Sequence, residues 1–197
     1  MTRADAHLTG YYSRVAALNT YVALFRGINI VRNNRLSMKD LKLLLEEHAC
    51  VDVQTYIQSG NVIFRSAAPD VSRLAEQLTA AVSKSHGFEP HVLVLTPREL
   101  ASAAAGNPFA EADSNPASVH LFFLAERPRK PDVKSLEALK TSTERFALKG
   151  KVFYLHTPDG FGRSKLATRA ERLLGVDATA RNWRTVTTLI EMAHAPR

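Results

Sequence analysis

The sequence has almost no cysteine and no long apolar run, and each shortage excludes a class of protein. Its 197 residues contain one cysteine, Cys50, so an internal disulfide is excluded. The seven histidines show neither HxxxH nor HExxH spacing, which argues against a built metal site. The longest apolar run, residues 119–125, is interrupted by His120 and is too short to span a bilayer. We therefore expect no disulfide, no metal, no other cofactor and no membrane partner, in a reducing cytoplasm.

Basic residues outnumber acidic ones. Lysine and arginine total 26 against 19 aspartates and glutamates, which gives a net charge of +7 and an isoelectric point near 9.8. Hydrophobic residues make up 45% of the chain and charged residues 23%, a balance typical of a folded globular protein. The excess of positive charge favours nucleic acid, phosphorylated or other anionic partners without choosing among them.

The chain is long enough for one large or two small domains. Residues 1–20 contain no secretory signal and are interpreted as an N-terminal extension. Residues 21–105 form a first half with a trailing helix, and residues 106–117, rich in Gly, Asn, Pro and Ala, form a linker. Residues 118–197 form a second half with a C-terminal helix.

Strand and helix patterns alternate in the same order in both halves. In the first half we expect strands at 21–28, 53–57, 62–64 and 91–95, and helices from Ser37, at 71–86 and at 97–105. In the second we expect strands at 119–124, 145–148, 152–155 and 178–181, and helices at 133–139, 164–174 and 182–194. Each order is that of a split βαβ unit, so the predicted fold class is α+β with two ferredoxin-like halves, mainly antiparallel sheets and helices packed on one face.

Three matched positions indicate an internal duplication. Gly60, Val62 and Phe64 of the first half align with Gly150, Val152 and Tyr154 of the second. Chance similarity between two alternating patterns is the alternative interpretation.

A first polar cluster is expected at one end of the first sheet. Strands 1 and 2 of a split βαβ unit run parallel, so the loop after strand 1 and the hairpin after strand 2 lie at the same end. These segments carry Arg26, Asn29, Ser59 and Asn61. An arginine fork with amides and a hydroxyl suits a phosphate, a carboxylate or a base edge. The alternative is that the polar side chains complete turns.

A second polar cluster is expected where the loop after residue 155 meets the end of the last strand. The residues are Arg163, Ser164 and Lys165, and then Arg181, Asn182 and Trp183. A glycine-rich turn that enters a helix leaves amides free for an anion, and tryptophan beside arginine can stack on a base. In the alternative, Trp183 is a buried anchor and Asn182 an N-cap.

The remaining candidates are weaker. His156 and Asp159 form a possible acid–base pair without a visible nucleophile. A basic edge, comprising Arg127, Arg129, Lys130, Lys149 and Lys151, could follow a phosphate backbone or simply be solvated.

Four segments, residues 21–29, 55–64, 162–166 and 179–186, resemble the domain of unknown function 1697 family of mainly bacterial proteins. The resemblance extends from residue 21 to the C-terminus and implies a two-part α+β fold with ferredoxin-like halves, but no established activity. Members usually follow the first motif with two glycines and a lysine, where this chain has Val31, Arg32 and Asn33.

The preferred hypothesis is a protein that binds an anionic small molecule, nucleotide or nucleic acid in a groove between the halves. One alternative is an enzyme acting on a phosphorylated or carboxylated small molecule, with His156 or Asp159 transferring a proton. The other is an adaptor that binds proteins through a sheet face or edge. The oligomeric state is left open.

Overall fold

The computed structural model describes residues 17–30 and 33–195. Residues 1–16, which make up most of the predicted N-terminal extension, lie outside the described residues, as do Val31 and Arg32. The first strand begins at Asn19, so the last two residues assigned to the extension belong to the first sheet.

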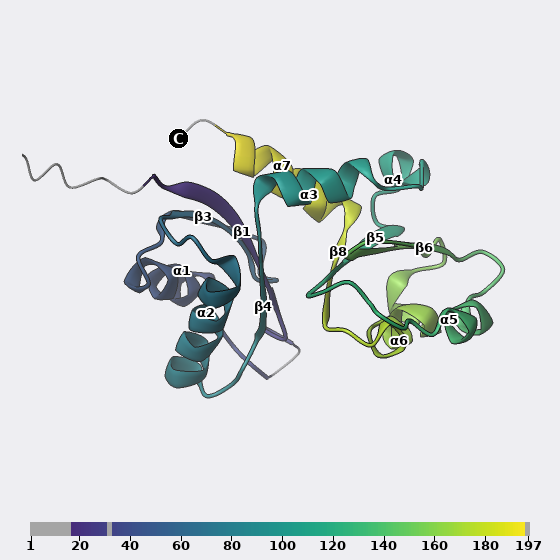
Figure 1. Ribbon diagram of the computed structural model, residues 1–197, viewed down its shortest axis with the longest axis horizontal. Helices are drawn as coiled ribbons and strands as arrows, with labels where there is room; N and C mark the ends of the chain where they lie inside the picture. Colours follow the sequence, from purple (N-terminus) through teal and green to yellow (C-terminus); the bar gives the residue numbers. More distant parts are fainter. Residues whose placement is uncertain (1–16, 31–32, 196–197) are drawn as a thin grey trace, which may run out of the picture.

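The described residues form two four-stranded antiparallel sheets (Figure 1). The strands are β1 (Asn19–Arg26), β2 (Val51–Tyr56), β3 (Asn61–Ser66), β4 (His91–Leu95), β5 (Val119–Leu124), β6 (Arg145–Lys149), β7 (Val152–His156) and β8 (Ala178–Asn182). The first sheet has the order β2-β3-β1-β4 and the second β6-β7-β5-β8. Counted within each half, both orders are second, third, first, fourth.

Seven α-helices and one 3₁₀ turn accompany these strands within the described residues. The helices are α1 (Met38–Glu47), α2 (Val71–His86), α3 (Pro97–Ala105), α4 (Glu111–Ser114), α5 (Val133–Leu139), α6 (Lys165–Leu174) and α7 (Trp183–His194), and the 3₁₀ turn covers Phe161–Arg163. In the described part of the chain, no helix has the length and apolar character to cross a membrane. The sequence did not predict α4, which lies inside the expected linker, or the 3₁₀ turn.

The helix ends follow local rules that the sequence makes visible. The Ser37 side chain caps α1, and Thr96 and Glu99 form a reciprocal capping box at α3. Gly87 and Gly175 end α2 and α6 in the left-handed conformation. Because these signals depend on neighbouring residues alone, the predicted helices and observed helices agree closely.

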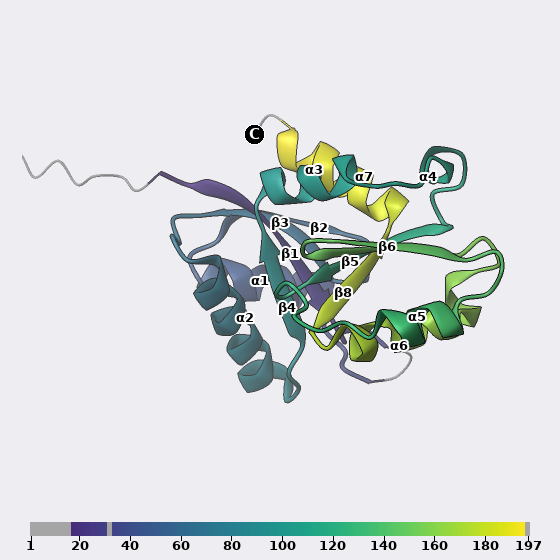
Figure 2. The same ribbon diagram turned by 45° about the vertical axis from the view of Figure 1, so that its right-hand side comes forward.

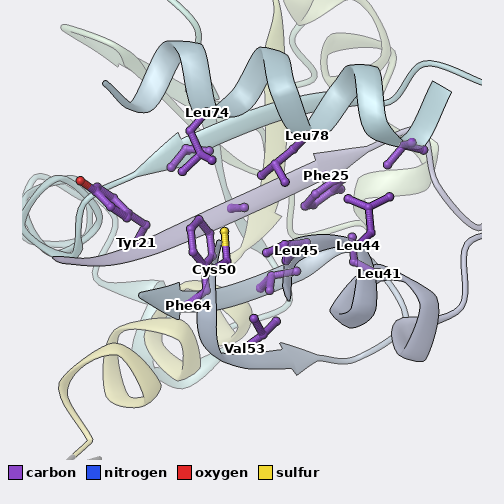
Figure 3. Packing of buried hydrophobic residues seen from close by; sticks show 14 of the residues in the cluster. Tyr21, Phe25, Leu41, Leu44, Leu45, Cys50, Val53, Phe64, Leu74 and Leu78 are labelled. Carbon is purple, nitrogen blue, oxygen red and sulfur yellow. The ribbon is translucent and has the colours of Figure 1, made fainter. Parts of the chain in front are cut away.

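Helices α1 and α2 cover one face of the first sheet. Tyr21, Phe25 and Phe64 project from this face and pack against the apolar sides of the two helices (Figure 3). Cys50 lies in the same core, and burial raises the pKa of its thiol to about 11, so it is protonated at neutral pH.

Helices α5 and α6 cover the equivalent face of the second sheet. Phe122, Phe153 and Leu155 project toward Leu136 of α5 and Leu166 of α6. Each sheet therefore has one face covered by the two helices of its own half.

The other faces of the two sheets are not exposed but share a third core. Val22, Leu24 and Ile63 of the first sheet belong to one cluster with Leu121 and Phe123 of the second. Helices α3 and α7 pack against each other and close this cluster from above (Figures 1 and 2). The prediction of helices on one face of each sheet therefore accounts only for the outer layers of the molecule. The inner faces also carry large apolar side chains, and these must be removed from water too.

The side chains proposed as duplicated positions face different layers. Phe64 points toward α1 and α2, whereas Tyr154 points into the shared core, away from α5 and α6. Adjacent strand residues point to opposite faces, so Phe153 occupies the face that corresponds to Phe64. The predicted match of Phe64 with Tyr154 is wrong by one residue, although the strand orders agree.

The β2–β3 hairpin requires glycine at position 60. Gly60 has φ +72°, and an added Cβ would lie 2.6 Å from Phe25 Cβ and 2.7 Å from Ile28 Cδ1. Its carbonyl accepts a hydrogen bond from the Phe25 backbone N–H at 2.7 Å. The hairpin is therefore pressed against the end of β1, where the first polar cluster was expected.

We predict that Gly60→Ala destabilises the protein more than Gly150→Ala. Gly150 also has positive φ, +60°, but an added Cβ would meet no atom within 4 Å. We expect the left-handed backbone alone to cost Gly150→Ala about 1 kcal/mol, and the clash to cost Gly60→Ala at least about 1 kcal/mol more. Urea denaturation of both variants measures the difference in their free energies of unfolding. Equal decreases in the two variants would show that the contact of Gly60 with Phe25 and Ile28 has no energetic effect.

Candidate functional site

The loop after β1 meets the β2–β3 hairpin, as the topology predicted. The Asn29 side-chain amide donates to the Leu36 carbonyl at 2.9 Å and to the Gln58 carbonyl at 3.1 Å. Asn29 Oδ1 accepts from the Leu36 N–H at 2.9 Å. Asn29 has φ +55°, so both its backbone and its side chain shape the loop. Three of its hydrogen bonds are thus made within the protein.

Arg26 connects the first half to the second. Its Nη1 lies 2.5 Å from Glu171 Oε2 and donates to the Ala178 carbonyl at 2.9 Å. Glu171 also accepts from the Ala178 N–H at 3.2 Å. The pair is about one-third exposed, and it joins the end of β1 to α6 and the start of β8. The sequence did not identify Glu171 as the partner, because the two residues are 145 positions apart.

Arg181 makes the reciprocal connection. Its Nε donates to Asn61 Oδ1, and its Nη2 donates to the carbonyls of Phe25 at 2.8 Å and Ser59 at 3.1 Å. The Asn61 side chain is fully buried, and its amide donates to Ser59 Oγ at 2.8 Å. Arg181 therefore brings the two predicted polar clusters into direct contact. Burial lowers its pKa to about 10, which leaves it charged at neutral pH.

We predict that Arg181→Met destabilises the fold by about 3 kcal/mol, because three acceptors of the first half lose their donor while the aliphatic stem is kept. Arg184→Met is the matched control, since Arg184 is exposed on the first turn of α7. We expect it to change the free energy of unfolding by less than about 0.5 kcal/mol. Urea denaturation compares the free energies of unfolding of the two variants. Similar small decreases would show that the hydrogen bonds of Arg181 to the first half do not stabilise the protein.

Three residues of the second predicted cluster support the starts of α6 and α7. Ser164 is buried and its Oγ accepts from the Ala167 N–H at 2.9 Å, which caps α6. Asn182 Oδ1 accepts from the Thr185 N–H at 2.9 Å, which caps α7. Trp183 is partly buried against the shared core. The Asn182 cap and the packing of Trp183 belong to the structural alternative raised from the sequence, whereas the Ser164 cap was not part of it.

Arg163 and Lys165 are exposed. A Cβ added to Gly160 would lie 3.5 Å from both Nε and Nη2 of Arg163, an ordinary contact distance, so the guanidinium lies close to the Gly160 backbone. Lys165 begins α6, and Arg169 and Arg172 follow it at helical spacing on the same exposed side. We call Arg163, Lys165, Arg169 and Arg172 the basic face. Sequence reasoning missed Arg169 and Arg172, although their spacing from Lys165 was a usable signal.

An imidazole–phenyl stack lies beside the basic face. The rings of His120 and Phe161 are 3.9 Å apart at their centroids and 20° from parallel. His120 is 9% exposed. Within the described residues, its Nδ1 is the one buried side-chain polar atom that has no hydrogen-bond partner. Burial lowers the pKa of His120 to about 4, so the ring is neutral at physiological pH.

We predict that His120 makes stability fall with acidity. The pKa of His120 is lowered on folding from 6.5 to about 4, so the unfolded chain binds a proton first as pH falls through this window. Lowering the pH from 7.5 to 5 should cost about 2 kcal/mol through this residue. Urea denaturation at both pH values measures the loss, and His120→Phe should reduce it. An equal loss in both proteins would remove His120 as the cause.

His156 and Asp159 are not hydrogen-bonded to each other. His156 Nδ1 lies 3.2 Å from Arg145 Nη2, and burial followed by the Arg145 charge lowers its pKa. Asp159 Oδ2 accepts from Thr143 Oγ1 at 2.5 Å. Each residue of the predicted acid–base pair thus has a different partner.

Surface hollows occur away from the predicted clusters. One of about 840 Å³ lies among the starts of β1 and α3 and the end of α7, lined by residues such as Tyr21, Arg98 and His194. Another of about 620 Å³ lies between α2 and the edge strand β4. Within the described residues, no group of three or more His, Cys, Asp or Glu side chains could hold a metal ion.

Comparisons with known proteins agree with this architecture. A family model described as "Protein of unknown function (DUF1697)" matches residues 18–154. The solved structure of the conserved bacterial protein SP0830 from Streptococcus pneumoniae is 22% identical, with a TM-score of 0.68. The similarity covers 90% of this chain and 99% of that one, and at this identity it concerns the fold alone. None of the curated proteins searched matches the chain.

Proposed function

The chain belongs to the DUF1697 family of proteins of unknown function, and we propose that it binds a polyanion, such as nucleic acid, through the basic face of its second half. The observation that carries the proposal is a cluster of exposed, unpaired cations. Within the described residues, none of the side-chain hydrogen bonds or ion pairs involves Arg163, Lys165, Arg169 or Arg172.

The geometry of α6 aligns these charges. Lys165, Arg169 and Arg172 are separated by four and three residues, so they lie within one narrow stripe on the outer side of the helix. The opposite side buries Leu166, Ala170 and Leu174, which fixes the rotation of the helix. Successive phosphates of a nucleic-acid backbone can lie along such a stripe. Each cation that neutralises a phosphate releases counterions from the polymer, and this release favours binding.

Two further features strengthen the positive field. The stripe starts at the N-terminus of α6, where the helix dipole favours anions, and Arg163 precedes it. Of the neighbouring acids, Glu171 is paired with Arg26, and Glu126 and Asp177 line a hollow together with Arg172. Near the other end, the Asp132 N–H donates to the Leu173 carbonyl, so the segment before α5 runs along the end of α6. That segment carries Arg127, Arg129 and Lys130, all exposed.

This proposal retains Arg163 and Lys165 as ligand-binding residues and assigns the other predicted positions differently. Arg26, Asn29 and Arg181 have intramolecular partners that a ligand would have to displace. Displacing Arg181 would also leave the buried Asn61 without its donor. The basic face is available without any such cost.

We also propose that each half is a ferredoxin-like unit and that the two arose by duplication. Support comes from the shared antiparallel strand order and from the shared alternation of strands and helices. The match of the third strands is then shifted by one residue relative to the sequence alignment of Phe64 with Tyr154.

We predict that the protein binds a fluorescein-labelled 20-nucleotide single strand. The logarithm of the binding constant should fall linearly with the logarithm of the salt concentration. Four contacted phosphates correspond to a slope of about −3. The double variant Arg169→Gln and Arg172→Gln should reduce the slope by about 1.4. Fluorescence anisotropy at several salt concentrations gives both values.

The matched control is the double variant Arg73→Gln and Lys84→Gln, which removes the same charge from exposed positions of α2. It should retain the wild-type slope. Equal effects of the two double variants would mean that net charge alone attracts the polymer, and the absence of binding by the wild-type protein would overturn the proposed function.

A further inference from the structure

A half-buried aromatic ring stands at the start of the basic face. Phe161 is the first residue of the 3₁₀ turn that leads into α6, and it is flanked by Gly160 and Gly162. Gly162 is exposed, and a Cβ added there would meet no atom within 4 Å. The space beside the Gly162 backbone, next to the ring in the chain, is therefore open.

The inner side of the ring is held in place. Its face lies on His120 at a centroid distance of 3.9 Å, and Phe122 lies 5.9 Å away at a tilt of 44°. His120 and Phe122 both belong to β5, and Phe161 packs against the outer core of the second half while staying partly exposed. A fixed, partly exposed aromatic ring is a surface on which a nucleic-acid base can stack.

Two cations follow the ring closely in the chain. Arg163, two residues further along the same turn, packs against Gly160, and Lys165 begins the stripe of α6. A single strand has unpaired bases that can leave the backbone path, whereas the bases of a duplex are stacked within it. A ring next to a row of cations therefore favours single strands.

We propose that Phe161 is a base-stacking platform and that the preferred ligand of the basic face is single-stranded nucleic acid. The inference rests on polyanion binding by the basic face and adds the class of polymer. Phosphates follow Lys165, Arg169 and Arg172, and one base lies on the outer side of Phe161. His120 supports the ring from beneath, and its neutral imidazole adds no charge to the stack.

The test compares two labelled 12-nucleotide oligomers with the same number of phosphates, oligo(dT) and a fully abasic strand. Fluorescence anisotropy should show that the wild-type protein binds oligo(dT) at least about 5-fold more tightly, the effect expected from one stacked base. Phe161→Leu should abolish this preference while binding the abasic strand as before, because leucine keeps an apolar contact without an aromatic face. Phe161→Tyr should retain the preference.

The outcomes separate the two proposals. Equal affinity of the wild-type protein for both oligomers would overturn base stacking and leave polyanion binding intact. Binding to neither would overturn both. The double variant Arg169→Gln and Arg172→Gln should weaken the binding of both oligomers by the same factor, so that the ratio of the two affinities stays unchanged. Thermal denaturation of Phe161→Leu, with a midpoint near that of the wild type, ensures that a lost preference reflects the lost ring.

Discussion

The arrangement of the two halves depends on two arginines, one from each half, whose side chains reach into the other half. Arg181, on the edge strand of the second sheet, donates to three acceptors of the first half. Arg26, at the end of the first strand, donates to Glu171 and Ala178 of the second half. Charged hydrogen bonds are directional, so these contacts fix how β8 crosses the end of the first sheet. The apolar core behind them supplies burial, which has no preferred direction.

This use of arginine shows that residue types common in anion sites can instead bond within the protein. Arg181 is partly buried and charged, and its donors already face carbonyls and an amide oxygen. Removing such a cation from its acceptors would leave them without their donor. Asn29, Ser164 and Asn182 are likewise engaged in closing a loop and capping two helices. The side chains of the basic face lie outside this network.

Helix α6 shows how one element serves three neighbours. Its apolar side faces the outer core of the second half, and Glu171 reaches the first half. The remaining side carries the basic face. A helix presents residues three and four apart on one side, so ten residues suffice for all three roles. The proposed polymer site is consequently built on a rigid element whose rotation is set by the core.

The sequence by itself determined the strands, the helices other than α4, and their order. Ser37, Thr96 and Gly87 mark helix ends through contacts with residues at most four positions away, and alternating apolar residues mark the strands. It also determined that the loop after β1 meets the β2–β3 hairpin, because that follows from topology.

Only the tertiary structure decided which face of each strand meets which layer and which polar groups pair. Phe64 and Tyr154 appear equivalent in sequence yet face different cores, since a shift of one residue reverses a strand side chain. The partners of Arg26 and Arg181 in the opposite half lie more than 100 positions away, and no local pattern encodes such a distance. Whether an arginine binds a ligand or the protein itself depends on those partners, and they exist only once the two sheets have packed.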